Sequence, residues 1–231
     1  EAEGWIIDGR VKLDGKVLKN PAVTVTTNSQ ILVDGQALPL PPLTRLWRYN
    51  KPAGLLTTHK DPEGRPTLFE NLPKILPRVI SIGRLDFNSE GLLLITNDGE
   101  LARRLELPST GWRRRYRVRV HGHVQKELLD KLKDGGFVDG IKFGPIKATL
   151  DRQQGSNAWI TMSLSEGKNR EVRKLMENLG WPVSRLIRIS YGPFQLGNLA
   201  KGAVDEVTQK ILREQLGFKT KRKSGGANRR R

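Results

Sequence analysis

The sequence predicts an α+β fold, in which strands and helices are mixed without a regular rhythm. Strand-like runs flank two Asp-Gly pairs, Asp14-Gly15 and Asp34-Gly35, and an Asp-Gly pair between alternating apolar residues is a strong signal for a β-hairpin. Further along, strand and helix patterns follow one another irregularly, whereas a doubly wound parallel sheet would show strand-helix-strand repeats. A chain of 231 residues, of which 36% are hydrophobic, suffices for one main core and a small second one.

The chain divides into three parts by composition. Residues 4–38 read as a small module of hairpins, and Pro39, Pro41 and Pro42 then mark a linker. We therefore expect a module over residues 1–42, a main domain over 43–217, and a basic tail over 218–231 that is disordered when unbound.

Hydrophobic periodicity predicts the elements of the main domain. A period of two places Tyr116, Val118 and Val120 on one face of a strand, and Arg115, Arg117, Arg119 and His121 on the other. Other strands are expected at Leu46–Tyr49, Val79–Ile82, Leu92–Thr96, Ala158–Leu164 and Ser184–Ser190. Helices are expected at Thr67–Leu72, Glu100–Leu105, Glu127–Lys133, Glu171–Leu179 and Asp205–Leu216.

The charge of the chain points to a polyanionic partner. Lys and Arg number 41 against 24 acidic residues, a net charge of +17, and removing the seven cations of Lys219–Arg231 still leaves 34 basic residues. Nucleic acid fits better than a membrane surface, because no basic helix carries a broad apolar face. The absence of Cys and the three isolated His residues argue against a metal site. With no secretory leader or long apolar stretch in view, we expect a cytoplasmic protein.

The segment Ile82–Leu94 holds the strongest candidate for chemistry. An extended run ends in a polar turn, and alternation places Arg84 and Asp86 on one side while Leu85 points into the core. A carboxylate with an Arg two residues away, in a partly buried cleft, could be held ionised for catalysis. The alternative is an ordinary turn Asp that caps its own backbone.

This segment resembles the aspartate motif of RsuA/RluB/RluE/RluF-type bacterial pseudouridine synthases. Their run Gly-Arg-Leu-Asp-x-x-Ser/Thr-x-Gly-Leu-Leu matches from Gly83 onward without gaps, and residues 96–99 (Thr-Asn-Asp-Gly) continue it. Residues 50–54 (Asn-Lys-Pro-Ala-Gly), 115–118 (Arg-Tyr-Arg-Val) and 166–173 (Glu-Gly-Lys-Asn-Arg-Glu-Val-Arg) look like three further motifs of the family, in the expected order.

The resemblance implies a role for individual residues. Asp86 would be the catalytic carboxylate, Tyr116 would pack against the target base, and Arg173 would pair with Asp86. Arg84 and Leu186 would line the substrate pocket. RNA contacts are expected from Lys51, Arg113, Arg114, Arg115, Lys168 and Arg170, and the Arg113–Arg119 run and the tail would hold phosphates around the target.

Taken without the resemblance, two of these residues have plainer interpretations. Tyr116 would be a core aromatic on the face of Val118 and Val120. On the helix after Asn169, an apolar stripe leaves Arg173 on the opposite, basic face with Arg170 and Lys174, and such a face is usually solvated.

The family's fold implies a mixed, largely antiparallel sheet with flanking helices, preceded by a small S4-like RNA-binding module. Family members begin that module with a helical stretch that this chain lacks, so it looks truncated. The implied reaction isomerises a uridine of ribosomal RNA to pseudouridine and requires no cofactor. The Asp-Phe-Asn-Ser-Glu-Gly form of residues 86–91 looks closest to members acting on 23S rRNA, and we expect a monomer.

Three alternatives remain. The substrate could be 16S rRNA, since target selection depends on loops and RNA shape. The chain could be a noncatalytic RNA-binding factor in ribosome assembly that keeps the fold and its basic surface. A glycosidase that uses Asp86 with Glu90 fits poorly, because four residues across a turn do not fix the separation that such carboxylate pairs need.

Overall fold

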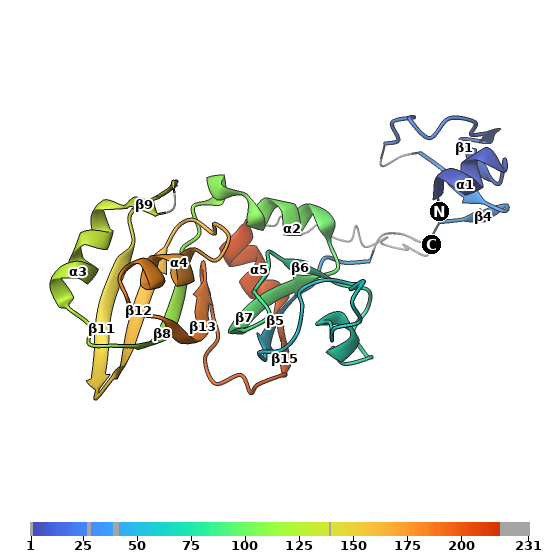
Figure 1. Ribbon diagram of the computed structural model, residues 1–231. Coiled ribbons are helices and arrows are strands. Elements are labelled where there is room, and N and C mark those ends of the chain that lie inside the picture. The colour runs from blue at the N-terminus through green and yellow to red at the C-terminus, as the bar shows by residue number, and fades with distance from the viewer. Residues whose placement is uncertain (1, 27–28, 39–41, 139, 218–231) are drawn as a thin grey trace, which may run out of the picture. The chain divides into compact units, whose positions relative to one another are not determined.

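The computed structural model describes residues 2–26, 29–38, 42–138 and 140–217, so the tail predicted at 218–231 lies outside the described residues. The chain divides into two compact units, Glu1–Leu43 and Thr44–Arg231 (Figure 1). No helix among the described residues is long and apolar enough to cross a membrane.

The first unit is a short helix followed by a small antiparallel sheet. Its strands run in the order β2-β1-β3-β4, and its elements are α1 (Ala2–Ile7), β1 (Val11–Leu13), β2 (Lys16–Val17), β3 (Ile31–Val33) and β4 (Gln36–Ala37). Both Asp-Gly pairs form the predicted hairpin turns, with positive φ at Asp14, Gly15, Asp34 and Gly35, as a type I′ turn requires. The sequence did not lead us to expect α1.

The second unit is built on a nine-stranded mixed sheet. Seven strands follow one another in the order β11-β12-β8-β13-β7-β5-β15, while β14 pairs with β13 and β6 with β7. Among the described strands, β7 and β13 form the one parallel pair, and the rest are antiparallel. The strands are β5 (Leu46–Lys51), β6 (Ile80–Ile82), β7 (Ser89–Thr96), β8 (Arg114–His121), β11 (Lys147–Gln154), β12 (Asn157–Leu164), β13 (Val183–Tyr191), β14 (Phe194–Gln195) and β15 (Val204–Val207).

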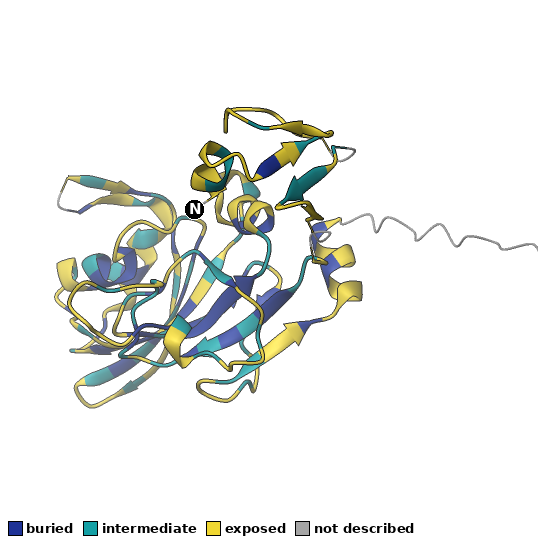
Figure 2. Cartoon of the chain, turned by 90° about the vertical axis from the view of Figure 1, so that its right-hand side faces the viewer, coloured by how far each residue is buried: buried dark blue, intermediate teal, exposed yellow. Residues whose placement is uncertain are grey.

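Helices cover both faces of this sheet. They are α2 (Gly99–Glu106), α3 (Lys126–Lys131), α4 (Glu171–Asn178) and α5 (Gln209–Leu216), with short 3-10 turns η1 (Phe69–Asn71), η2 (Pro108–Thr110) and η3 (Leu132–Asp134) and a separate hairpin, β9 (Gly136–Val138) and β10 (Ile141–Phe143). On β7, Leu93 and Ile95 join the core cluster of α3 and α4, whereas Leu92 and Leu94 join that of α2 and α5. The strand is therefore buried on both faces, as its unbroken apolar run indicates (Figure 2).

Two predicted helices are wrong in part. The segment expected as one helix over Asp205–Leu216 begins as strand β15, which pairs with β5, and helix α5 begins only after the capping residue Thr208. Val204 and Val207 have a spacing that also suits a helix, so the local pattern does not show the strand. Within Thr67–Leu72 only the short turn η1 forms.

Candidate active site

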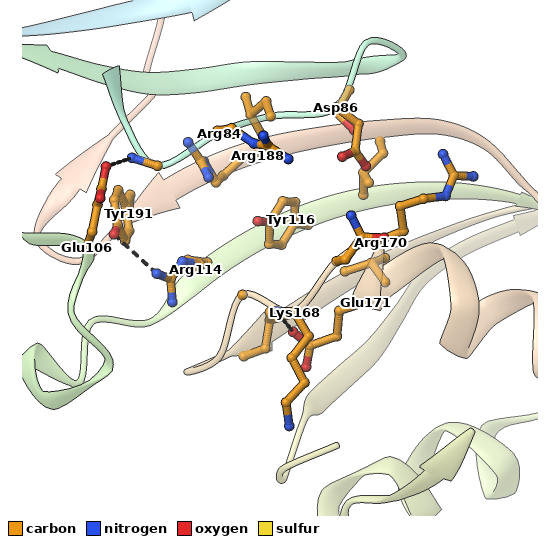
Figure 3. Close-up of a pocket in the computed structure, with 18 of the residues that line it drawn as sticks. Arg84, Asp86, Glu106, Arg114, Tyr116, Lys168, Arg170, Glu171, Arg188 and Tyr191 are labelled. Atoms are coloured by element: carbon orange, nitrogen blue, oxygen red, sulfur yellow. Dashed lines mark hydrogen bonds between the residues drawn. The ribbon is translucent and has the colours of Figure 1, made fainter. Parts of the chain in front are cut away.

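A cavity of about 300 Å³ opens in the second unit between four segments of chain. They are the loop between β6 and β7, the first residues of β8, the loop before α4, and β13. The side chains that line it and bear on its chemistry are Arg84, Asp86, Glu106, Arg114, Tyr116, Lys168, Arg170, Glu171, Leu186, Arg188 and Tyr191 (Figure 3). This volume lies in the usual range for a ligand pocket.

The loop between β6 and β7 presents Asp86 to the cavity. Leu85 is buried and its neighbours Arg84 and Asp86 line the cavity, as alternation predicts. The loop is fixed through its backbone: Ser89 N donates to Asp86 O at 3.0 Å, and Thr57 Oγ1 donates to Leu85 O at 2.8 Å. The Asp86 carboxylate itself accepts no hydrogen bond from a described residue, so it is free to meet a substrate.

Lys51 holds the same loop from its buried side. Its side chain is fully buried, and Nζ lies within hydrogen-bond distance of the carbonyl oxygens of Pro52 (3.0 Å), Asp86 (3.2 Å), Phe87 (3.4 Å) and Ser89 (3.0 Å). Burial lowers the pKa of Lys51 to about 8, while the charges of Asp86 and Glu90 act to raise it. The prediction that Lys51 contacts RNA is therefore wrong, because no part of the side chain reaches solvent.

Arg173 also acts on the Asp86 loop from inside the protein. It is buried, and its two Nη atoms donate to Val183 O and Asn88 O, each at 3.2 Å. Burial lowers the pKa of Arg173, and so does the charge of Arg170, whereas Asp86 raises it. The interpretation as a residue of the solvated face is wrong. No ion pair joins Arg173 to Asp86 within the described part of the chain, so the guanidinium positions the loop through its backbone.

Tyr116 and Leu186 form the floor of the cavity. Tyr116 is 8% exposed and Leu186 is 5% exposed, and both line the cavity. Figure 3 shows the Tyr116 ring and the Asp86 carboxylate directed into the same space. Tyr116 thus belongs both to the core, as its spacing predicts, and to the cavity, as the resemblance implies.

Arg188 is a cavity residue that the sequence interpretation missed. It lies opposite Tyr116 in the register of β13 and β8, and it is 3% exposed. Nε donates to Leu92 O at 2.7 Å, but Nη2 is buried without a hydrogen-bond partner in the described structure. Its position two residues after Leu186 on one strand face could have indicated it.

Cations surround the mouth of the cavity. Arg114 donates to Ser165 O at 3.0 Å and to Tyr191 Oη at 3.2 Å, and it lies over the Tyr191 ring. Arg170 is exposed, in a left-handed conformation, directly before α4. Lys168 lines the cavity as well, but its ammonium bonds to Lys142 O and Glu166.

Arg113 and Arg115 lie away from the cavity. Neither lines it, and both line a separate hollow on the opposite face of the sheet. The expectation that the whole Arg113–Arg119 run surrounds the target is therefore wrong, because alternate residues of a strand point to opposite faces.

Glu171 is a buried carboxylate at the cavity wall. Its Oε2 accepts from Lys168 N at 3.0 Å, and Oε1 has no partner among the described residues. Burial raises the pKa of this carboxyl. Glu171 therefore supports the loop before α4, because this hydrogen bond fixes the backbone of the segment that carries Lys168 and Arg170.

Comparison with known proteins gives consistent matches. Residues 45–178 match the family model for RNA pseudouridylate synthase. An uncharacterised RNA pseudouridine synthase of Rickettsia prowazekii is 48% identical over 93% of this chain and 91% of its own length. Ribosomal large subunit pseudouridine synthase B of Pseudomonas aeruginosa is 41% identical over 95% of this chain and 59% of its own length. A crystal structure of a pseudouridylate synthase superposes with a TM-score of 0.67 at 25% identity, covering 93% of this chain and 91% of the other.

Proposed function

The chain belongs to the RNA pseudouridylate synthase family and is a pseudouridine synthase, an isomerase; from this premise we propose that it acts on a uridine of 23S rRNA with Asp86 as its catalytic carboxylate. The observation that carries the catalytic assignment is the Asp86 carboxylate, which faces the cavity without a hydrogen-bond partner among the described residues while its backbone is held by Lys51.

The reaction needs a group beside the ribose. The bond between C1′ and N1 of the uridine breaks, the uracil turns, and a bond forms from C5 to C1′; the C5 hydrogen is released to solvent and N1 takes up a proton. Asp86 would assist as a nucleophile at C1′ or as a base on the sugar.

The cavity fits a nucleotide that has been turned out of the RNA stack. Tyr116 offers an aromatic face for the uracil, and Leu186 closes the floor. The guanidinium of Arg188, which lines the cavity and is only partly paired within the described structure, would donate to the nucleotide, because a buried guanidinium gains most from a charged or carbonyl oxygen. Arg84, Arg114 and Arg170 would hold flanking phosphates at the mouth.

The choice of 23S rRNA rests on relatives. Three proteins 41% to 44% identical to this chain, from Pseudomonas aeruginosa, Yersinia pestis and Pasteurella multocida, carry the name ribosomal large subunit pseudouridine synthase B. We also propose that the first unit is an S4-like module that binds RNA, since β1 and β2 carry the exposed Lys12 and Lys16. The enzyme is proposed to be monomeric and to act in the cytoplasm.

Tritium release from C5-labelled uridine in 23S and 16S rRNA transcripts tests the proposal. We expect release from 23S rRNA by the wild-type protein and none by Asp86→Asn, which keeps the side-chain volume but removes the charge. Asp61→Asn, which changes an ion pair with Arg65 outside the cavity, is the matched control and should keep its activity. Release from 16S rRNA alone would contradict the substrate, and full activity of Asp86→Asn would contradict the catalytic role.

A further inference from the structure

We propose that the enzyme has a second RNA-binding surface on the face of β8, β12 and β11 that lies opposite the active-site cavity. We call it the outer basic face and define it by its cations, Arg113, Arg115, Arg117, Arg119, Lys147 and Arg152. The kind of partner, an RNA backbone, follows from the proposed function. The position of the surface follows from the geometry of the sheet.

Cross-strand pairing assembles this face. Arg115 pairs with Ser163, which pairs with Lys147, and Arg119 pairs with Trp159, which pairs with Arg152. Residues that pair directly in a sheet point to the same side, so cations from both β8 and β11 flank a central strand of Trp159, Thr161 and Ser163. Figure 1 shows these three strands side by side at one end of the sheet.

The helices leave this face open. On β8, Tyr116, Val118 and Val120 alternate with the exposed Arg residues. They point to the other side of the strand, where they join the core cluster to which α3 and α4 contribute. Arg115, Arg117 and Arg119 are exposed, as are Lys147 and Arg152. The clusters of α2 and α5 lie over β5 and β7, at the other end of the sheet. Within the described chain no helix therefore covers the outer basic face.

The charge of this face is nearly all of one sign. Asp151 is its acidic residue: it accepts from Thr161 at 2.8 Å and lies 3.8 Å from Arg117, whose guanidinium also stacks over Trp159. Arg119, Lys147 and Arg152 make no side-chain hydrogen bond or ion pair with any described residue. Like charges gathered on one sheet face repel each other, and a polyanion removes that repulsion.

The outer basic face and the cavity meet at the beginning of β8. Arg114 lines the cavity, while Arg113 and Arg115 on either side line a hollow of about 530 Å³ on the outer face. A second hollow of about 270 Å³ follows beside Arg119, Trp159 and Arg152. An RNA strand that leaves the cavity past Arg114 can thus turn round the end of the strand and continue along the outer face. Successive Arg residues on β8 lie roughly 7 Å apart, which places one cation after another along such a path.

Equilibrium binding of RNAs of two lengths tests this surface, using the full chain. The probes are a 23S rRNA transcript and a short RNA hairpin that cannot reach both surfaces. For the variant Arg119→Gln, Lys147→Gln, Arg152→Gln we expect the affinity for the transcript to fall about tenfold and the salt slope to drop by about 2, since each lost phosphate contact contributes roughly 0.7 to 0.9. The affinity for the hairpin should change less than about twofold.

A matched variant controls for net charge. Lys74→Gln, Lys126→Gln, Lys133→Gln removes three exposed cations outside both surfaces, and it should leave the difference between the two RNAs intact. An equal loss in both variants, or no loss in the first, would overturn the proposal; an unchanged melting temperature excludes misfolding. Because the readout is binding, the two proposals can fail separately. If the wild-type protein releases no tritium but the first variant shows the length-dependent loss of affinity, the proposed reaction is refuted and the outer basic face is retained.

Discussion

The Lys51 ammonium donates to the backbone carbonyl of Asp86 at 3.2 Å, from the side of the loop that faces the core. The catalytic candidate is thereby held by its main chain, and its carboxylate is left for the substrate. Two buried cations share this task, because Arg173 grips the same loop at Asn88 O. Positioning through the backbone keeps the carboxylate out of competing ion pairs.

Replacing Lys51 by Met should loosen this loop. The carbonyl oxygens of Asp86, Phe87 and Ser89 would lose the buried ammonium, and those of Asp86 and Phe87 would keep only their backbone donors. We expect a loss of about 2 kcal/mol in the free energy of unfolding, as for lost hydrogen bonds to a charged group. Displacement of Asp86 should reduce kcat about 100-fold with little change in KM. Steady-state kinetics and urea unfolding measure both effects. Lys60→Met removes an exposed charge as the control, and an equal effect there would contradict the role of Lys51.

The buried ammonium also predicts a pH dependence of stability. The pKa of Lys51 is about 8 in the folded protein and about 10.4 when unfolded, so the unfolded chain binds more protons between these values. The cost of burying the charge is complete below pH 8 and falls as the pH rises toward 10.4. We expect the free energy of unfolding of the wild type, relative to Lys51→Met, to rise by up to about 1.4 kcal/mol per pH unit in this window. A flat difference across this range would show that Lys51 titrates elsewhere.

Arg173→Lys should separate positioning from binding. One ammonium cannot reproduce two guanidinium hydrogen bonds, to Val183 O and Asn88 O, in their fixed directions. We expect kcat to fall about tenfold or more while the Kd for RNA stays within about twofold. Single-turnover rates and filter binding give the two quantities. Lys174→Gln, on the next position of α4, is the control; a loss of affinity without a loss of rate in Arg173→Lys would reject the positioning role.

Arg188→Lys should affect substrate binding more than turnover. The bond to Leu92 O can be kept by an ammonium, but the two Nη atoms of this cavity residue, of which Nη2 has no partner in the described structure, are lost. We expect KM to rise about tenfold, as for the loss of one charge-assisted hydrogen bond. Arg185→Lys on the same strand, where the guanidinium pairs with Glu90 outside the cavity, should leave KM unchanged. Equal KM values for both variants would argue against a substrate contact.

Alternation along β8 and the hairpin turns at Asp14 and Asp34 could be predicted because they depend on neighbours in sequence. The placement of Lys51 and Arg173 could not. Both are charged residues that local patterns assign to the surface, and they are buried because carbonyl groups distant in the chain accept their hydrogen bonds. The beginning of α5 was misplaced for a related reason, since Val204–Val207 becomes a strand only through its partner β5.

The parallel pairing of β7 with β13 has a consequence for biosynthesis. Leu186 lies opposite Ser89, 97 residues earlier, and Arg188 lies opposite Gly91. Contacts between residues so far apart in the sequence form slowly, because the chain loses conformational entropy on closing the loop before the contacts stabilise it. On the ribosome the Asp86 loop is therefore made early but acquires its neighbours Leu186 and Arg188 only when most of the chain has emerged. A nascent or C-terminally shortened chain would carry Asp86, the proposed catalytic carboxylate, without a pocket, and would remain inactive until β13 docks.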